Sequence, residues 1–252
     1  MRDIYVFLPC YNEERNITEL INTWNEQKKN LSDLGYSLRI FAIDDCSTDR
    51  TKDKIKELEN EYENVSLIVH DVNKNLCGGL NTSISRFLEV GNEDSLMVLM
   101  DGDNTHDPKY IYSLLDKTNQ GFDCVIASRY CNESNVVGVP SHRRFMSDMA
   151  RYYYRFMLRV PNVEDYTCGY RIYTYNCIKQ LVEVFGSDPV KEKSFACMME
   201  LLYKLHLTGT AFSEVGFELR YDNKKGESKM QVIKTMRKSL FVAYKLRRHK
   251  TT

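Results

Sequence analysis

Short apolar runs alternate with amphipathic segments over the first half of the chain. The runs are rich in β-branched and aromatic residues, as strands are, and they cover residues 4–8, 38–43, 65–69 and 96–100. Each run is followed by apolar residues at helical spacing, within 13–31, 51–62, 84–88 and 110–117. Four strand–helix units in series predict an α/β fold, with a parallel sheet, helices on both faces and right-handed crossovers.

The second half of the chain is less regular. Residues 124–127 and 211–219 have the composition of strands, and residues 144–158 and 195–207 have helical spacing. We therefore predict a single α/β domain over residues 1–228, followed by a C-terminal amphipathic helical segment over 229–252.

Polar clusters stand at the carboxyl ends of the four predicted strands. They are PCYNEE, DDCSTD, NKNLCGG and DGD, which begin at residues 9, 44, 73 and 101. Ligands of parallel sheets bind at this edge of the strands. Four clusters on one rim therefore predict a binding site.

Composition narrows the class of protein. Charged residues make up 28% and apolar residues 42%, which is typical of a globular domain. No apolar run approaches the length that crosses a bilayer, and the N-terminus does not resemble a signal peptide, so we expect a cytoplasmic protein. The eight cysteines form no CxxC pair, which favours free thiols in a reducing compartment over a zinc site or a disulfide scaffold.

The DGD cluster places two carboxylates on either side of one glycine. Asp101 and Asp103 would repel each other unless a cation lies between them, and Mg²⁺ or Mn²⁺ takes such oxygen ligands and shares its shell with substrate phosphates. The pair therefore predicts a metal that bridges to a diphosphate. An exposed turn also favours Asp and Gly, so the tripeptide alone leaves both interpretations open.

A series of motifs carries a family resemblance. They are FLPCYNEERNI, AIDDCSTDRT, NLCGGLN, LMDGDNTHDPKYI, VIASRY, DYTCGYRIY and YDNKKGESK, and together they cover nearly the whole chain. In this order the motifs resemble those of family 2 glycosyltransferases, whose GT-A fold is a Rossmann-like, mostly parallel sheet flanked by helices. The chain is most similar to the branch of dolichol-phosphate and polyprenyl-phosphate hexose synthases.

The resemblance implies roles for individual residues. It assigns the nucleotide sugar to Pro9, Tyr11, Glu13, Asp44, Asp45 and Gly79, the metal to Asp101 and Asp103, and the phosphates to Arg129. The alternatives are that Tyr11 packs, that the two aspartates after residue 43 begin a capped loop, and that Arg129 pairs with an aspartate. The branch commonly has Gln where this chain has Thr105, followed by His106, which leaves the metal preference open.

The chemistry of the acceptor decides whether a base is needed. A lipid phosphate is already anionic near neutral pH, because its second pKa is about 6, and it needs only cationic positioning. Candidate acceptor-binding residues near the matching motifs are Arg143, Arg171, Glu200, Arg220, Ser228 and Lys229. A hydroxyl acceptor would need a carboxylate base, for which Asp165 and Glu200 are the candidates. Residues 165–173 are similar to the D-x-T-G-x-x-R-x-Y pattern of the lipid-phosphate branch, which favours polyprenyl phosphate.

Charge is unevenly distributed along the chain. Residues 229–252 contain eight Lys or Arg and no acid, so residues 1–228 carry a net charge of −8. Apolar residues of this segment fall near one helical face and basic residues around the other. Such a helix suits an anionic membrane surface, and the alternative is a terminal helix that packs on the core and bears a basic tail.

The prediction is a metal-dependent, inverting transfer of a hexose from a nucleotide-diphosphate sugar to polyprenyl phosphate, at the cytoplasmic face of a membrane. Inversion is implied by the resemblance. Two rivals stay open: transfer to a hydroxyl of a cell-surface glycan, and a nucleotide-sugar-binding protein without catalysis. No nucleic-acid partner is expected, and the sequence fixes neither the sugar nor the oligomeric state.

Overall fold

The strands form two sheets in the residues that the computed structural model describes, which are 1–138, 141–220 and 232–248. They are β1 (Arg2–Cys10), β2 (Tyr36–Asp44), β3 (Val65–Val69), β4 (Leu96–Leu99), β5 (Cys124–Ser128), β6 (Asn135–Val137), β7 (Arg171–Thr174), β8 (Phe212–Gly216) and β9 (Glu218–Arg220). The larger sheet has the order β3-β2-β1-β4-β7-β5-β8, and β6 pairs with β9 in the smaller one.

The larger sheet is parallel except at one strand. β1 pairs in parallel with β2 and β4, β2 with β3, and β5 with β8. β7 lies antiparallel between β4 and β5. The prediction of an α/β fold with a mostly parallel sheet is confirmed. Because β1 to β4 point the same way, the loops that follow them lie at one edge.

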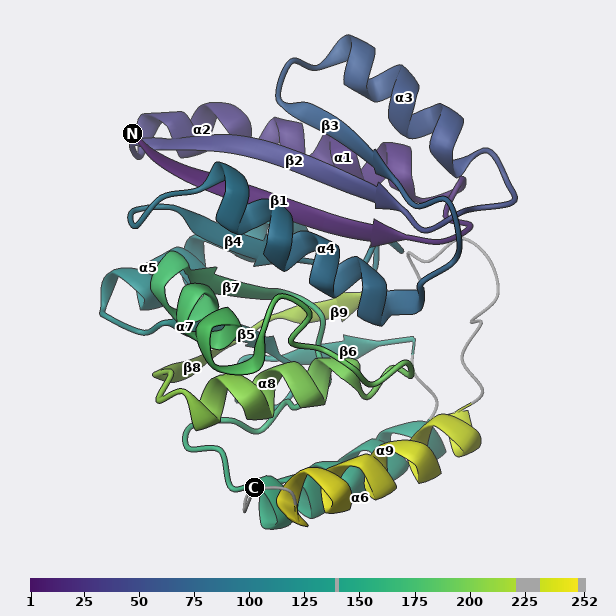
Figure 1. Cartoon of the computed structure of the whole chain (residues 1–252), viewed down its shortest axis with the longest axis vertical. Coiled ribbons are helices and arrows are strands. Elements are labelled where there is room, and N and C mark those ends of the chain that lie inside the picture. Colours follow the sequence, from purple (N-terminus) through teal and green to yellow (C-terminus); the bar gives the residue numbers. More distant parts are fainter. Residues whose placement is uncertain (139–140, 221–231, 249–252) are drawn as a thin grey trace.

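Helices cover both faces of the larger sheet. They are α1 (Ile17–Glu26), α2 (Lys28–Asp33), α3 (Thr51–Glu61), α4 (Asn75–Val90), α5 (Ile111–Asn119), α6 (Ser141–Leu158), α7 (Tyr175–Phe185), α8 (Cys197–Leu207) and α9 (Val232–Arg248), with a 3₁₀ turn η1 at Pro108–Tyr110. In Figure 1, α4, α7 and α8 lie in front of the sheet and α1 lies behind it. The buried face of α1 consists of the residues whose helical spacing predicted it, Ile17, Leu20, Ile21 and Trp24.

Two predicted elements are divided in the structure. The single helix expected over 13–31 becomes α1 and α2, because the chain tightens at Gln27, whose N–H donates to the Trp24 carbonyl three residues back. The strand expected over 211–219 becomes β8 and β9, which belong to different sheets. Phe217 lies between them and is buried against the ring of His106. The apolar pattern located this segment, but not the point where it leaves the larger sheet.

The C-terminal helix α9 packs against α6 and α8 at one end of the molecule (Figure 1). Val242 and Ala243 are buried on its inner face, and the Tyr154 hydroxyl of α6 lies 2.6 Å from the Ser239 hydroxyl of α9. The predicted C-terminal helix is therefore present, and part of it belongs to the core. Among the described residues, no helix combines the length and the apolar character needed to cross a membrane.

The cysteines are distributed through the fold as free thiols. All eight are unpaired with one another, and six of them are buried. Burial raises the pKa of Cys177 to about 12, so this thiol stays protonated. Such buried thiols act as small apolar side chains and are chemically inert.

Candidate active site

The loops that follow β1, β2, β3 and β4 form one rim. The register aligns the strand ends, since Cys10 pairs with Asp44 and Asp44 with Val69. Each of the four connections contains one residue other than glycine with a φ between 55° and 61°, namely Asn12, Cys46 and Asn104 in their loops and Asn75 at the start of α4. Left-handed backbone at such residues costs free energy and gathers at functional sites. Its repetition in all four connections marks this rim as the candidate site.

Hydrogen bonds join the loop after β1 to the loop after β2. The Asn12 N–H donates to the Ser47 hydroxyl over 2.9 Å, and the Asn12 side-chain oxygen accepts from the Thr48 N–H over 2.8 Å. The Glu13 N–H donates to the Thr51 hydroxyl over 2.7 Å. The two loops therefore form one rigid wall of the site. Ser47, Thr48 and Thr51 were part of a motif in the sequence, but the pattern did not show that they bind the other loop.

Three of the residues expected to contact the nucleotide sugar, Tyr11, Glu13 and Gly79, differ in exposure and in the groups they contact. Tyr11 is 40% exposed, so its ring is accessible to a ligand. Glu13 accepts a hydrogen bond from the Asn16 amide over 2.7 Å. Gly79 is buried in α4, and a Cβ there would lie 2.8 Å from the Cβ of Pro9. Gly79 is thus required for the close approach of α4 to β1, which shapes the site from behind.

Asp44 and Asp45 are both buried but are bonded differently. Asp44 Oδ2 accepts from the Ser47 N–H over 3.3 Å, while Asp44 Oδ1 has no hydrogen-bond partner among the described residues. Asp45 Oδ1 lies 2.7 Å from His70 Nδ1 and accepts from the Lys74 N–H over 2.8 Å. A buried carboxylate oxygen without a partner is costly and points to a ligand that donates to it. Asp45 instead holds the loop after β3, through a histidine that the sequence analysis had not singled out.

Glycines place the DGD carboxylates against their neighbours. A Cβ at Gly169 would lie 2.6 Å from Asp101 Oδ2, and a Cβ at Gly102 would lie 2.6 Å from Cys10 Sγ. Any larger residue at either position would push the DGD loop away from the rim. Asp103 Oδ1 accepts hydrogen bonds from Thr105 through its hydroxyl, over 2.7 Å, and its N–H, over 3.3 Å. The structure therefore brings the DGD loop together with the end of β1 and with the DYTCGYRIY motif.

Four carboxylates lie near enough to the buried Cys10 thiol at the rim to change its pKa. Burial raises the pKa of the Cys10 thiol, and four negative charges raise it further, those of Glu13, Asp44, Asp103 and Asp101. Carboxylates that converge in this way repel one another, and a hard divalent cation relieves the repulsion. Within the described residues, no group of three or more His, Cys, Asp or Glu side chains could enclose a metal alone. The residues present fit Mg²⁺ or Mn²⁺: the two DGD carboxylates could hold such an ion, and water and substrate oxygens would complete its shell.

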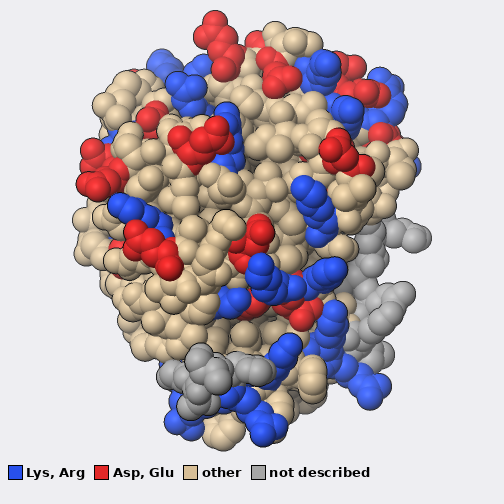
Figure 2. All heavy atoms as spheres, viewed as in Figure 1, with Lys and Arg blue, Asp and Glu red and all other residues tan. Residues whose placement is uncertain are grey.

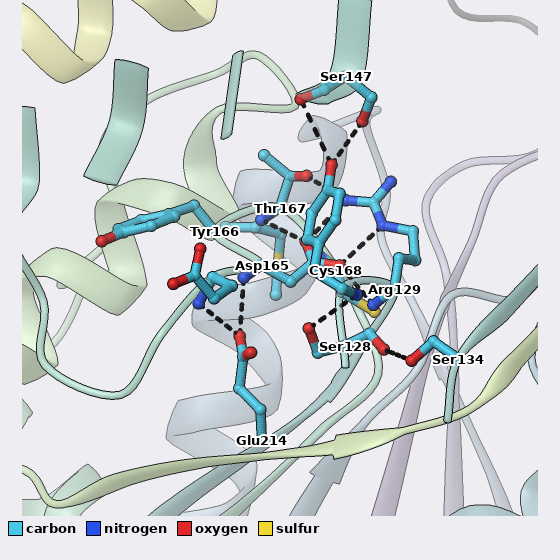
Figure 3. A network of polar contacts seen from close by, with 12 residues as sticks. Ser128, Arg129, Ser134, Ser147, Asp165, Tyr166, Thr167, Cys168 and Glu214 are labelled. Carbon is cyan, nitrogen blue, oxygen red and sulfur yellow. Dashed lines mark hydrogen bonds and ion pairs between the residues drawn. The ribbon is translucent and has the colours of Figure 1, made fainter. Parts of the chain in front are cut away.

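Arg129 and Asp165 form a buried ion pair (Figure 3). Arg129 Nε donates to Asp165 Oδ2 over 2.7 Å and Arg129 Nη2 donates to Asp165 Oδ1 over 2.6 Å. The Arg129 N–H also donates to Asp165 Oδ2, and Nη2 donates to the Thr167 hydroxyl over 2.7 Å. The Arg129 side chain stays 25% exposed, whereas that of Asp165 is fully buried. Pairing with an aspartate, the alternative role for Arg129, is thus present, and it holds the guanidinium in one orientation.

The two candidate bases are fully engaged by the protein. Burial alone would raise the pKa of Asp165, but the Arg129 charge and hydrogen bonds outweigh it and lower this pKa to about 2. Glu200 Oε2 accepts from the N–H groups of Lys191 and Glu192 over 2.9 and 2.7 Å, and Oε1 pairs with Lys204 over 2.7 Å. Both carboxylates therefore have protein partners, and the lowered pKa makes Asp165 a poor proton acceptor.

Arg171 has a structural position instead of the expected contact with an acceptor. Its side chain is fully buried, and it donates to the carbonyls of Met198 and Tyr166 over 3.1 and 3.0 Å. The reason is that β7 lies between β4 and β5, where Arg171 pairs with Leu99 and Ile126, and that its side chain is covered by the segments of Met198 and Tyr166. Of the other acceptor candidates, Ser228 and Lys229 lie outside the described residues, as do the side chains of Arg143 and Arg220.

Comparisons with known proteins extend these observations. Residues 5–182 match the family model described as glycosyl transferase family 2. A dolichol-phosphate mannosyltransferase of Pyrococcus furiosus is 28% identical over 229 residues, which cover 90% of this chain and 59% of the relative. A polyprenol monophosphomannose synthase of Mycolicibacterium smegmatis is 27% identical over 212 residues, which cover 83% of this chain and 74% of the relative. The chain thus spans about three fifths of the length of the Pyrococcus protein.

A solved structure shows the same fold. It is glucosyl-3-phosphoglycerate synthase of Mycobacterium tuberculosis, in complex with Mn²⁺, uridine diphosphate and phosphoglyceric acid. The TM-score is 0.69 at 16% sequence identity, and the match covers 98% of this chain and 78% of that one. This likeness confirms the predicted GT-A architecture.

Proposed function

The chain belongs to glycosyl transferase family 2, and from this premise we propose that it moves one hexose from a nucleotide-diphosphate sugar to a polyprenyl phosphate. In this reaction a phosphate oxygen of the acceptor bonds to the anomeric carbon from the face opposite the leaving group. The bond from that carbon to the diphosphate breaks, and the nucleoside diphosphate leaves with the electron pair. The configuration at the anomeric carbon is inverted.

The convergence of carboxylates at the rim carries this proposal. Asp101 and Asp103 would hold Mg²⁺ or Mn²⁺, which when bound neutralises charge on the leaving diphosphate. Asp44 Oδ1, buried and without a partner among the described residues, would accept a hydrogen bond from the nucleoside. The accessible ring of Tyr11 lies on the same loop as Glu13 and would contact the nucleotide. The donor thus occupies the loops after β1, β2 and β4.

The state of Asp165 and Glu200 supports a phosphate acceptor over a hydroxyl acceptor. A hydroxyl must lose its proton as the new bond forms, and both carboxylates considered for this task are bonded to the protein. A phosphate monoester is already anionic near neutral pH, with a second pKa of about 6, and needs no base. What it needs is a fixed cation, and the Arg129 side chain, which is 25% exposed, is held in place by Asp165. The names of the two relatives, a dolichol-phosphate mannosyltransferase and a polyprenol monophosphomannose synthase, agree with this choice.

The surface of α6 and α9 supports a membrane-bound acceptor. One narrow face of α6 carries four exposed apolar side chains, Phe145, Met149, Tyr152 and Phe156, which are 57–68% exposed. Their spacing of four, three and four residues aligns them in one stripe along the helix. A stripe of large apolar side chains left in water marks an interaction surface.

The neighbouring helix α9 adds positive charge. Its outward face contains three exposed basic residues and two exposed aromatic ones, Arg237, Phe241, Tyr244, Lys245 and Arg248. Lys238 is also exposed, but it pairs with Glu192 over 3.1 Å. Lys and Arg gather in the lower part of Figure 2, where Figure 1 draws α6 and α9. An apolar stripe beside basic side chains complements an anionic bilayer, where each nearby charge contributes about 1 kcal/mol. We assign this surface to the cytoplasmic leaflet that holds the acceptor.

Binding to vesicles tests the membrane surface. We expect the double substitution of Phe145 and Phe156 by Ser to weaken binding to phosphatidylserine-containing vesicles at least about tenfold, because each ring contributes roughly 1.5–3 kcal/mol when buried in lipid. The matched control is Val184→Ser on α7, since Val184 is 63% exposed but lies outside the stripe. If the double variant binds vesicles as tightly as wild type, the stripe does not bind the membrane.

A transfer assay tests the reaction. The purified protein is incubated with Mn²⁺ or Mg²⁺, a panel of UDP- and GDP-sugars and a short-chain polyprenyl phosphate, and lipid-linked sugar is measured by mass spectrometry. We expect one donor to give a product that chelation by EDTA abolishes. Nucleotide-sugar binding without any product from the panel would contradict the proposal and favour a binding protein.

A further inference from the structure

A chain of hydrogen bonds leads from Cys168 to the carboxylate of Asp103. Cys168 Sγ lies 3.5 Å from His106 Nε2, and His106 Nδ1 lies 3.1 Å from Thr105 Oγ1. Thr105 Oγ1 in turn lies 2.7 Å from Asp103 Oδ1. We name these four residues the relay. It starts in the DYTCGYRIY motif and ends on a carboxylate of the DGD loop.

Counting protons fixes the direction of every bond in the relay. The carboxylate of Asp103 can only accept, so the single hydroxyl proton of Thr105 points to it. Thr105 Oγ1 must then accept, which places a proton on His106 Nδ1 and leaves Nε2 as an acceptor for the Cys168 thiol. Burial lowers the pKa of His106 to about 4 and raises that of Cys168 to about 12, in agreement with a neutral ring and a protonated thiol. All three donors therefore point toward Asp103.

The relay is enclosed and its ring cannot turn. Thr105, His106 and Cys168 are 4–7% exposed. The His106 ring is stacked on Phe217, with 5.2 Å between ring centroids, and meets the Tyr170 ring edge-on at 5.9 Å. Both nitrogens are thus held in the orientation that the hydrogen bonds require.

The segment that begins the relay also contacts the rest of the site. Asp165 Oδ1 accepts from the Cys168 N–H over 3.0 Å, so the backbone of Cys168 is tied to the carboxylate that fixes Arg129. The next residue, Gly169, lies against the carboxylate of Asp101. One segment therefore contacts both DGD carboxylates, Asp101 directly and Asp103 through the relay.

We propose that Thr105 and His106 are positioning residues, which fix the Asp103 carboxylate for a divalent cation through the relay that begins at Cys168. This inference rests on the proposed function only in taking Asp103 as a ligand of the cation. Partners of metal ligands orient them and prevent competing hydrogen bonds, and their loss weakens metal binding by about 10–100-fold.

Binding of Mn²⁺ tests the relay without any transfer. The EPR signal of free Mn²⁺ is followed during titration of the acceptor-free protein, in the presence of GDP and then of UDP. We expect Thr105→Val, which keeps the shape but removes the hydroxyl, to raise the Kd for Mn²⁺ about tenfold. The matched control Thr105→Ser keeps the hydroxyl and should stay within about twofold of wild type. His106→Phe keeps the stacked ring and should raise the Kd about threefold.

A double variant distinguishes the loss of Asp103 positioning from a general loosening of the fold. If the relay acts in series, His106→Phe in the Thr105→Val background adds less than about twofold to the Kd, whereas independent effects would multiply. Thermal unfolding shows whether each variant is folded. If Thr105→Val is unfolded, the relay is tested by comparing the Kd for Mn²⁺ of His106→Phe with that of Thr105→Ser.

Three results would overturn the relay: wild-type affinity for Mn²⁺ in Thr105→Val, multiplied effects in the double variant, or no uptake of Mn²⁺ by the wild-type protein. Uptake of Mn²⁺ with the expected order of variants, but without any lipid product in the transfer assay, supports the relay while the proposed acceptor fails.

Discussion

Asp44 at the rim and two carboxylates in the second half of the chain, Asp165 and Glu200, are satisfied in different ways. Asp44 Oδ1 has no partner among the described residues, whereas both oxygens of Asp165 are bonded to Arg129. Glu200 is likewise engaged by two backbone N–H groups and by Lys204. Unused bonding capacity in a buried carboxylate points to a ligand, and saturated capacity points to a structural role. The rim therefore offers a carboxylate oxygen of Asp44 to a ligand, whereas Asp165 holds Arg129 in place.

Substitution of a DGD carboxylate should give the largest effect, and the quantity that falls should be the rate of sugar transfer. We expect Asp103→Ala to lower kcat/KM by about 10³-fold, since the lost charge stabilisation is on the order of 4 kcal/mol. The free energy of unfolding should change little. The control is Asp33→Ala in α2, which is exposed and lies away from the rim. Transfer that persists in Asp103→Ala at the wild-type rate would remove this residue from the site.

Substitution of Asp165 should act on stability. Asp165→Asn leaves the Arg129 guanidinium without its charged partner, and we expect the free energy of unfolding to fall by about 3 kcal/mol. Urea denaturation measures this change, with Asp44→Asn as the matched control at another buried aspartate. Equal stability losses in the two variants would break the comparison between the regions.

Acid should weaken the same ion pair. The pKa of Asp165 is lowered from its ordinary value of 3.8 to about 2, so the folded state holds its proton less tightly than the unfolded state. The contribution of this group, about 2 kcal/mol, is therefore complete above about pH 4 and is lost as the pH falls through 2. In urea titrations, the difference between wild type and Asp165→Asn should narrow from about pH 4 downward. A difference that does not depend on pH would show that the pairing is not ionic.

Asp44 should give the smallest effect, confined to the nucleotide. Asp44→Asn removes a charged acceptor, and we expect the Kd of the nucleotide product to rise about tenfold, because a hydrogen bond to a charged group contributes roughly 1.5–3 kcal/mol. Calorimetric titration with GDP and UDP measures it. Unchanged affinity for both nucleotides would mean that the unpartnered oxygen serves another purpose.

The same contrast explains what could be predicted from the sequence. The first four strands are parallel, so a polar cluster after each apolar run had to lie on one rim, and Asp44, Asp101 and Asp103 are found there. The motif glycines could be located but not explained. Only the structure shows that Gly169 makes room for the carboxylate of Asp101.

The second half could be predicted less well because its chain direction reverses. Arg171 was expected to bind the acceptor, yet it begins the antiparallel strand β7 and is buried. Asp165 was a candidate base, and no spacing rule reveals that Arg129, 36 residues earlier, saturates it. His106 was noted only as the neighbour of an unusual Thr105. Its contact with Cys168, 62 residues away, depends on tertiary packing.

The choice of acceptor can be tested with two lipids that differ in one group. A polyprenyl phosphate and the polyprenol of the same chain length are offered with the same donor, and lipid-linked sugar is measured over time by mass spectrometry. Because both candidate bases, Asp165 and Glu200, are bonded to the protein, our expectation is product from the phosphate and none from the alcohol. Glycosylation of the alcohol at a comparable rate would contradict it.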